Sequence, residues 1–420
     1  MKESTRTPLP FTGYQKFVIA VLAFLQFTII LDFMIVSPLG PMMMPALNMT
    51  AAQFGIVVSA YAFSAGIAGI LAAGFADRYD RKKLLMFFYI GFVLGTLFCG
   101  LANTYEMLVA ARIVTGLFGG VIGAIVFAIV TDLFPLEQRG RVMGFMQTAF
   151  AASQILGLPA GLFITNLMGW HAPFIMIVIV SVIVGVVIFT RLRPVDEHLK
   201  IKAEKSPFRH LLATVSIPRH VLAFSATALL SIGGFMLMPF GNVFTVHNLG
   251  INVDKLPLIY LITGLASIAI GPLVGRACDK FGSFRTFTVG TLVSIVTVFT
   301  YTHMGVTPLL GVILINVVMF VGVFSRMIPS QTLMSAIPTP ANRGAFMSVS
   351  SSLQQIAGGF ASVLAGLIVI VGPGGELHRF EIVGYVVLGT AFVTLFMMWR
   401  IHRSIPEAPR ATQADGSTSH

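Results

Sequence analysis

Long apolar blocks separated by short polar breaks follow one another from about residue 16 to about residue 400. An α-helix needs roughly 20 apolar residues to cross the hydrocarbon core of a membrane, so this pattern predicts about twelve crossings. Turn-forming residues such as Pro38, Pro41 and Gly372 to Gly375 mark the breaks. The expected spans are residues 16–38, 51–74, 84–103, 106–133, 141–167, 172–191, 219–247, 256–277, 286–304, 307–330, 343–371 and 380–401.

Composition indicates the same class of protein. Of the 420 residues, 56% are hydrophobic and only 10% are charged, whereas soluble domains carry about 25% charged residues. The first apolar block is long and lacks a small-residue cleavage site, so we expect a retained helix and not a removed signal peptide. The chain is therefore predicted to be an integral membrane protein that is all-α.

The positive charges gather on one side of the predicted membrane segments. Lys255 and Arg379 are the only basic residues in the loops of the other side. Basic residues favour the cytoplasmic side, so both termini are expected in the cytoplasm. This distribution argues against a nucleic-acid partner despite the net charge of +11. The basic loops can still attract anionic lipid headgroups weakly and without specificity. The basic clusters are residues 78–83, 139–141, 191–219, 276–285, 343 and 400–410.

The chain contains an internal repeat. Residues 73–83 read AGFADRYDRKK and residues 275–285 read GRACDKFGSFR, a displacement of 202 residues. Repetition at this distance predicts two halves of six helices each. The expected division is a cytoplasmic N-terminus at 1–15, a first bundle at 16–191, a linker at 192–218, a second bundle at 219–403 and a disordered tail at 404–420.

The first copy of the repeat resembles the signature between the second and third helices of the major facilitator superfamily, G-x-x-x-D-R-x-G-R-[RK]. Ala73 and Asp80 depart from its two glycines. The resemblance implies twelve transmembrane helices in two pseudo-symmetric six-helix bundles around a central site. The matching residues are Asp77, Arg78, Arg81 and Lys82, and the second copy supplies Asp279 and Lys280.

We expect this loop to act as a cytoplasmic latch. A carboxylate at a helix end, such as Asp77, can cap the next helix and pair with a basic residue, which would hold one conformation closed. The alternative is a charge cluster that only fixes the orientation in the membrane.

Three ionisable residues lie well inside the predicted spans, namely Asp32, Arg112 and Arg326. Asp32 lies about sixteen residues, or roughly 24 Å, into the first helix, and Arg112 lies about six residues, or roughly 9 Å, below the opposite surface. In a core roughly 30 Å thick these depths coincide, so we predict that Asp32 and Arg112 pair. A closed pair would be structural, but a carboxylate whose partner moves can carry a proton, and we favour this second role for Asp32.

Arg326 has no evident partner in the sequence. One interpretation makes it the counter-ion of an anionic cargo or of a lipid headgroup, and the other has it bonding backbone carbonyls beside Pro329. Both alternatives stay open at this point.

Two further segments resemble motifs of proton-coupled members of the superfamily. ARIVTGLFGG, residues 111–120, is similar to the fourth-helix motif, with Arg112 and Gly116 matching. ILGLPAGLF, residues 155–163, resembles the fifth-helix motif of antiporters, in which we expect a kinked glycine face to pack against the other bundle. An ordinary kink is the alternative. The antiporter-motif residues are Gly157, Pro159 and Gly161.

The resemblance and these motifs imply a proton-coupled exporter in a bacterial inner membrane that works by alternating access, and the 36 Phe and 21 Met residues favour a small amphipathic cargo. The alternatives are a sugar or metabolite permease or symporter and a non-transporting membrane receptor. No phosphate-binding loop, nucleophile elbow or Cys/His metal spacing occurs, so we expect no enzyme activity, cofactor or metal. We expect a monomer. The candidate cavity residues are Gln26, Tyr61, Gln147, Gln154, Asn242, Tyr260, Asn316, Arg326, Gln354 and Gln355.

Overall fold

The computed structural model describes residues 11–72, 79–196, 199, 214–339 and 343–404. Its first half contains α1 (Gly13–Ala46), α2 (Ala51–Ala72), α3 (Arg81–Gly100), α4 (Tyr105–Leu133), α5 (Leu136–Ala152), the π-helix η2 (Ser153–Gly157), α6 (Leu158–Met168) and α7 (Ala172–Arg191). Its second half contains α9 (Pro218–Phe235), α10 (Gly241–His247), the 3₁₀ turn η4 (Val253–Lys255), α11 (Leu256–Phe281), α12 (Ser283–Thr302), α13 (Leu309–Ser335), α14 (Arg343–Ile368) and α15 (Phe380–Ser404).

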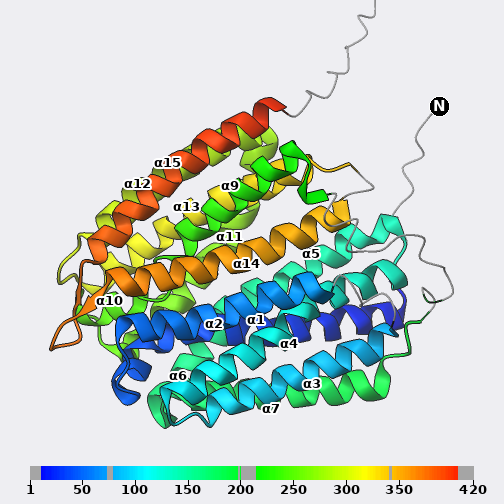
Figure 1. Cartoon of the computed structure of the whole chain (residues 1–420), viewed down its shortest axis with the longest axis horizontal. Coiled ribbons are helices and arrows are strands. Elements are labelled where there is room, and N and C mark those ends of the chain that lie inside the picture. The colour runs from blue at the N-terminus through cyan, green and yellow to red at the C-terminus, as the bar shows by residue number, and fades with distance from the viewer. Residues whose placement is uncertain (1–10, 73–78, 197–198, 200–213, 340–342, 405–420) are drawn as a thin grey trace, which may run out of the picture.

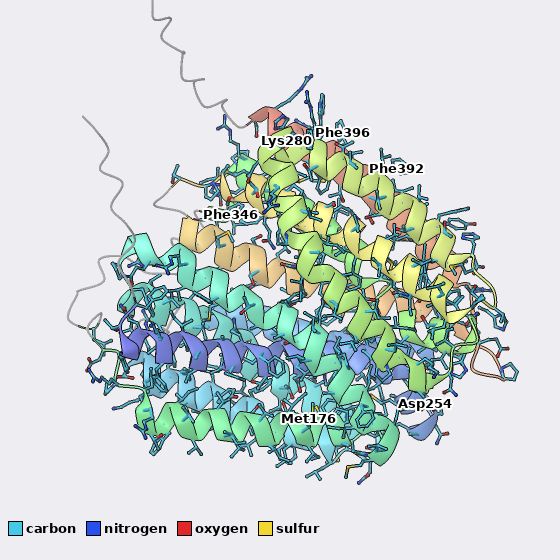
Figure 2. All side chains as sticks on the ribbon, turned by 180° about the vertical axis from the view of Figure 1, so that it is seen from behind. Met176, Asp254, Lys280, Phe346, Phe392 and Phe396 are labelled. Atoms are coloured by element: carbon cyan, nitrogen blue, oxygen red, sulfur yellow. The ribbon has the colours of Figure 1, made fainter. Side chains whose placement is uncertain are left out.

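The two halves lie side by side as separate groups of helices (Figure 1). The start of α1 and the end of α15 lie at the same end of the molecule, which we call the terminal end. The opposite, distal end carries α10 and a small hairpin of β1 (Ile370–Val371) and β2 (Leu377–His378), paired antiparallel. Figure 2 shows Lys280, near the end of α11, and Asp254, in the turn η4 just before its start, at opposite ends of the molecule, so α11 crosses from one end to the other.

Eleven helices in the described part of the chain are long and apolar enough to cross a membrane. The seventh predicted span, 219–247, is instead broken into α9 and α10 by a turn at residues 236–240. The predicted end of the first span at residue 38 is wrong, because α1 continues through Pro38, Pro41 and Pro45 to Ala46. Prolines inside membrane helices are tolerated where neighbouring groups satisfy the freed carbonyls, so proline is a weaker stop signal there than in water.

Among the described residues, the apolar core cluster that combines both halves lies at the distal end. Its members include Leu39, Phe54, Phe240 and Phe244. At the terminal end each half has a cluster of its own, one built around α1, α3 and α4 and the other around α9, α12 and α15. The halves are therefore closed against each other at the distal end.

Small residues bring helices into close contact along the seams. A Cβ added at Gly66 of α2 would lie 2.9 Å from the carbonyl oxygen of Ser352 in α14, and one added at Gly264 of α11 would lie 2.8 Å from Ile155 in η2. Glycine at such positions lets the helix backbones approach each other. The contacts α2–α14 and η2–α11 form the two seams between the halves.

Gly120→Val should destabilise the fold. A Cβ at this position of α4 would overlap Cα of Ala65 in α2, and this backbone atom cannot move aside as a flexible side chain would. Overpacking of this kind costs about 1–3 kcal/mol. The midpoint of thermal unfolding in detergent should fall, whereas Gly123→Val on the same helix should change it little, because no atom lies within 4 Å of a Cβ there. Equal losses in both variants would contradict this packing.

Candidate functional site

A cavity of about 640 Å³ lies between the halves and is lined mostly by the second. From the first half come Met34, Ser37 and Pro38 of α1 with Gln154 and Leu158. At its distal limit lie Tyr301 and Thr245, and towards the terminal end it reaches Met334 and Met347. Because the distal core closes one end, the cavity extends towards the terminal end. The predicted cavity residues that line it are Gln154, Asn242, Tyr260, Asn316, Arg326 and Gln354.

Other predicted cavity residues lie elsewhere. Tyr61 is buried in α2, where the guanidinium carbon of Arg112 lies 4.6 Å from the centre of its ring. Gln26 and Gln355 are half-buried and are not among the lining residues. Gln147 lies on α5, and its side chain is outside the described part of the structure. Polarity alone therefore selected too many residues, since helix orientation decides which of them face the cavity.

A polar bridge between the halves lies at the distal limit of the cavity. The amide nitrogen Nδ2 of Asn242 donates to the Tyr260 hydroxyl at 2.9 Å and to Oγ of Ser37 at 3.4 Å. The Ser37 hydroxyl in turn donates to the backbone carbonyl of Met238. Ser37 belongs to the first half and the other three residues to the second, so these bonds hold α1 against the turn before α10. We call these four residues the distal bridge.

The predicted pair of Asp32 and Arg112 is present. Oδ2 of Asp32 lies 2.8 Å from Nη1 of Arg112, and the Thr96 hydroxyl donates to Oδ1 of Asp32 at 3.1 Å. The side chain of Asp32 is fully buried and that of Arg112 is 1% exposed. This pair joins α1, α3 and α4 in the interior of the first half.

Because both side chains are buried, a change in the charge of either one has a large effect on the stability of the pair. Two charges held away from water are stable only while each compensates the other, because an unpaired charge in such a place costs several kcal/mol. Protonation of Asp32 would remove that compensation and weaken the contact that fixes α1 to α4. The geometry can therefore couple the charge of one carboxyl group to the position of one helix.

The sequence model of the Major Facilitator Superfamily matches residues 22–362. The chain belongs to this superfamily of transporters. Among curated relatives, the uncharacterized MFS-type transporter YtbD of Bacillus subtilis (strain 168) is 26% identical over 84% of this chain and 88% of its own length. Multidrug resistance protein 2 of the same organism is 23% identical over 84% of this chain and 89% of its own.

Solved structures of other superfamily members have the same fold. The crystal structure of a D-xylose-proton symporter has a TM-score of 0.75 with 19% identity, and covers 94% of this chain and 99% of that chain. A bacterial homologue of the lysosomal transporter Spinster, in an inward-facing and unoccupied conformation, has a TM-score of 0.70 with 16% identity, and covers 93% and 96% of the two chains. The predicted all-α architecture of two bundles is confirmed.

The superfamily signature loop is described only from Tyr79 onward, so Asp77 and Arg78 lie outside the described residues. Nε of Arg81 lies 3.2 Å from Oδ2 of Asp132 at the end of α4. Nζ of Lys82 donates to the carbonyl oxygen of Phe189 in α7 at 2.9 Å. These contacts hold the start of α3 against its own half.

The departure from the signature at Asp80 has a structural explanation, and the residues of the second copy of the loop have different surroundings. Oδ1 of Asp80 accepts a hydrogen bond from the backbone amide of Lys83 at 2.9 Å, so this residue caps α3 where the signature has glycine. Asp279 and Lys280 are exposed at the end of α11, with Nζ of Lys280 lying 5.3 Å from the centre of the Phe281 ring. The latch therefore stays a prediction.

The fifth-helix segment is a π-helix followed by α6, with Pro159 in the first turn of α6. A Cβ at Gly157 would lie 2.8 Å from Leu31, and one at Gly161 would lie 2.9 Å from Ile35. Both contacts are with α1, so the expectation that these glycines face the other bundle is wrong. They instead let η2 and α6 approach the helix that carries Asp32, and Ile155 makes the contact with the other half.

Sequence reasoning missed two kinds of residue at the candidate site. Thr96 and Asp132, which bond to Asp32 and Arg81, lie far from them in sequence and match no motif. Several cavity hydroxyls also carried no signal, because Ser and Thr in a helix bond to their own backbone wherever they face. Ser231 donates to the carbonyl of Thr227, for example, at 2.8 Å. Their helix face would have been the only available guide.

Proposed function

We propose that this chain is a proton-coupled exporter of small amphipathic molecules that works by alternating access. The observation that carries the proposal is the buried ion pair of Asp32 with Arg112, in which Asp32 belongs to a helix that also lines the cavity. An ionisable pair inside a membrane helix bundle is expensive and usually functional. Asp32 would take up and release the proton, and Arg112 would stabilise the Asp32 carboxylate while it is deprotonated.

The direction of the cavity is the one in which an exporter would load its cargo. Basic residues gather in the loops of the terminal end, which the positive-inside rule assigns to the cytoplasm. With this orientation the cavity extends towards the cytoplasm and is closed by the distal core and the distal bridge. An exporter in this state would collect its cargo from the cytoplasm, and an importer would release it there, so the vesicle assay below decides between them.

Helix α1 provides the mechanical link. It carries Asp32, it lines the cavity through Met34 and Ser37, and it bonds across the halves through the same Ser37. A proton on Asp32 would loosen α1 from α4, and movement of α1 would change both the cavity wall and the distal bridge. Proton binding and cavity opening would then influence each other through one rigid element.

The wall of the cavity suits an amphipathic cargo. Methionine side chains are flexible and polarizable, so they adapt to apolar bodies of different shape, whereas a sugar requires a dense set of hydrogen-bonding groups. The name of the relative Multidrug resistance protein 2 agrees with this cargo class. The methionines that line the cavity are Met34, Met238, Met319, Met327, Met334 and Met347.

The sign of cargo-driven proton movement tests the proposal. Purified protein is placed in vesicles that contain a pH-sensitive dye, with the membrane potential clamped and no pH gradient. Lipophilic cations, neutral drugs, sugars and organic anions are then added outside in turn. An antiporter exchanges entering cargo for leaving protons, so the lumen should become alkaline whatever the orientation of the protein.

Protein-free vesicles correct for compounds that cross the membrane unaided. Acidification of the lumen by a sugar would identify a symporter instead, the alternative that the fold of the D-xylose-proton symporter leaves open. Cargo entry without any change of pH would exclude proton coupling.

A further inference from the structure

The charge of the cavity wall comes from one residue. Among the described residues that line the cavity, Arg326 of α13 is charged and none is an Asp or a Glu. The buried carboxylate of the first half, Asp32, is not a lining residue and is already paired with Arg112. The wall therefore presents an uncompensated positive charge to whatever enters.

The guanidinium of Arg326 lacks the partners that such a group normally has. The residue is 8% exposed, and its Nε and Nη2 atoms are buried with no hydrogen-bond partner in the described part of the chain. The ring centre of Phe287 lies 6.0 Å from its guanidinium carbon, a contact that orients the group without neutralising it. By contrast, Arg112 at similar burial has the carboxylate of Asp32 at 2.8 Å.

A structural role for Arg326 does not account for this geometry. Pro329, three residues further along α13, removes one backbone donor from the helix, but Nε and Nη2 of Arg326 do not bond to a carbonyl oxygen there. Burial of an unpaired cation is strongly unfavourable, and a neutral side chain would avoid that cost. Arg326 is itself a lining residue of the cavity, so an anion bound there lies close enough to its guanidinium to compensate the charge.

We propose that the cavity binds an amphipathic organic anion whose acidic group pairs with Arg326. This inference rests on the proposed export function and narrows its cargo class. The planar guanidinium offers parallel donors that match a carboxylate, sulfonate or phosphate group. The methionines Met319, Met327 and Met334, on the same helix as Arg326, receive the apolar body. A cationic cargo would instead face a like charge in a wall without a carboxylate.

Binding of three probes with one apolar body tests this inference. The probes are 1-pyrenebutyrate, 1-pyrenebutanol and protonated 1-pyrenebutylamine, and their affinity for the purified protein in phosphatidylcholine nanodiscs is measured by fluorescence anisotropy. The anion should bind more tightly than the alcohol, and the cation most weakly. Arg326→Gln should weaken binding of the anion by about ten- to hundredfold, the usual range for a hydrogen-bonded charged group.

Two comparisons separate binding by Arg326 from general effects. Arg326→Gln should leave the alcohol unchanged, and Arg326→Lys should restore part of the preference for the anion. Arg285→Gln, which removes an exposed arginine of α12 outside the cavity, should leave all three affinities unchanged. The inference is overturned if the cation binds as tightly as the anion, or if Arg326→Gln weakens the anion and the alcohol equally.

The same chemistry could come from a free anion or from the headgroup of an anionic lipid. Nanodiscs with added phosphatidylglycerol distinguish these sources. Unchanged binding of 1-pyrenebutyrate assigns the site to a free anion, and competition that disappears in Arg326→Gln assigns it to a lipid headgroup. With either result, the group that binds Arg326 is an anion.

A second measurement needs no cargo. Ser330 lies one turn beyond Arg326 and lines the cavity, so Ser330→Cys in a Cys278→Ser background places a thiol beside the guanidinium. An anionic methanethiosulfonate should react faster than a cationic one, after correction for their rates with a free thiol, and Arg326→Gln should remove the difference. Equal rates in the presence of Arg326 would overturn the inference. Neither binding nor labelling needs a proton gradient, so failure of proton coupling leaves both tests valid.

Discussion

Vesicles with the Asp32→Asn variant are expected to show no cargo-driven change of lumenal pH beyond that of protein-free vesicles. Asparagine has nearly the shape of aspartate, and its amide oxygen can still accept the hydrogen bond from Arg112 while its amide nitrogen donates to the Thr96 hydroxyl, but it cannot take up a proton. Cargo binding through Arg326 should persist, because Asp32 is not a lining residue. Loss of proton movement with retained binding would separate the two sites.

The variant also leaves Arg112 buried without its counter-ion, which can cost about 3–5 kcal/mol of stability. The double variant Asp32→Asn/Arg112→Gln removes both charges and should regain part of the thermal stability without regaining proton movement. A double variant that drives protons like the wild type would make the pair a static ion pair. Wild-type proton movement in Asp32→Asn alone would have the same meaning.

A disulfide across the distal end is expected to stop transport completely. A Cβ at Gly40 of α1 would lie 3.1 Å from a methyl carbon of Val243 in α10, so Gly40→Cys and Val243→Cys place two thiols close together across the halves. The other near atoms belong to the end of the Phe54 side chain, which can shift. Oxidation would lock the distal end closed, and alternating access requires that end to open.

Transport of a compound identified in the vesicle assay checks this, in a Cys278→Ser background. Dithiothreitol should restore transport, and each single cysteine variant should transport with or without oxidant. Binding of 1-pyrenebutyrate should survive oxidation, because the cavity extends towards the terminal end. Full transport by the oxidised, cross-linked protein would exclude opening at the distal end.

The sequence predicted the features that depend on the spacing of apolar residues along the chain and on the depth of a residue in the membrane. The pairing of Asp32 with Arg112 followed from the rise of a helix and the thickness of a bilayer, and the 2.8 Å contact confirms it. The distal bridge did not follow, since Ser37 and Asn242 come from different halves and their contact depends on how the halves dock. Depth along a helix is local information, whereas rotation about its axis and docking are set by tertiary packing.

The sequence also did not predict the irregularities of the backbone. The prolines of α1 were interpreted as a break, and the helix passes through all three. The π-helix at Ser153–Gly157 and the turn at residues 236–240 interrupt segments that their composition presents as continuous. In a membrane, apolar content decides whether a segment is helical, and such content is nearly the same for a regular and an interrupted helix.

The two buried arginines lie in different halves of the molecule, Arg112 beside its carboxylate in the first and Arg326 in the cavity wall of the second. If the first serves the proton and the second the cargo, then the two halves have separate tasks. Changes in cargo preference would accumulate in α9 to α15 without disturbing the energy source. A chimera that keeps the first half of this chain and takes the second from a relative would have the proton coupling of this chain and the cargo preference of the relative.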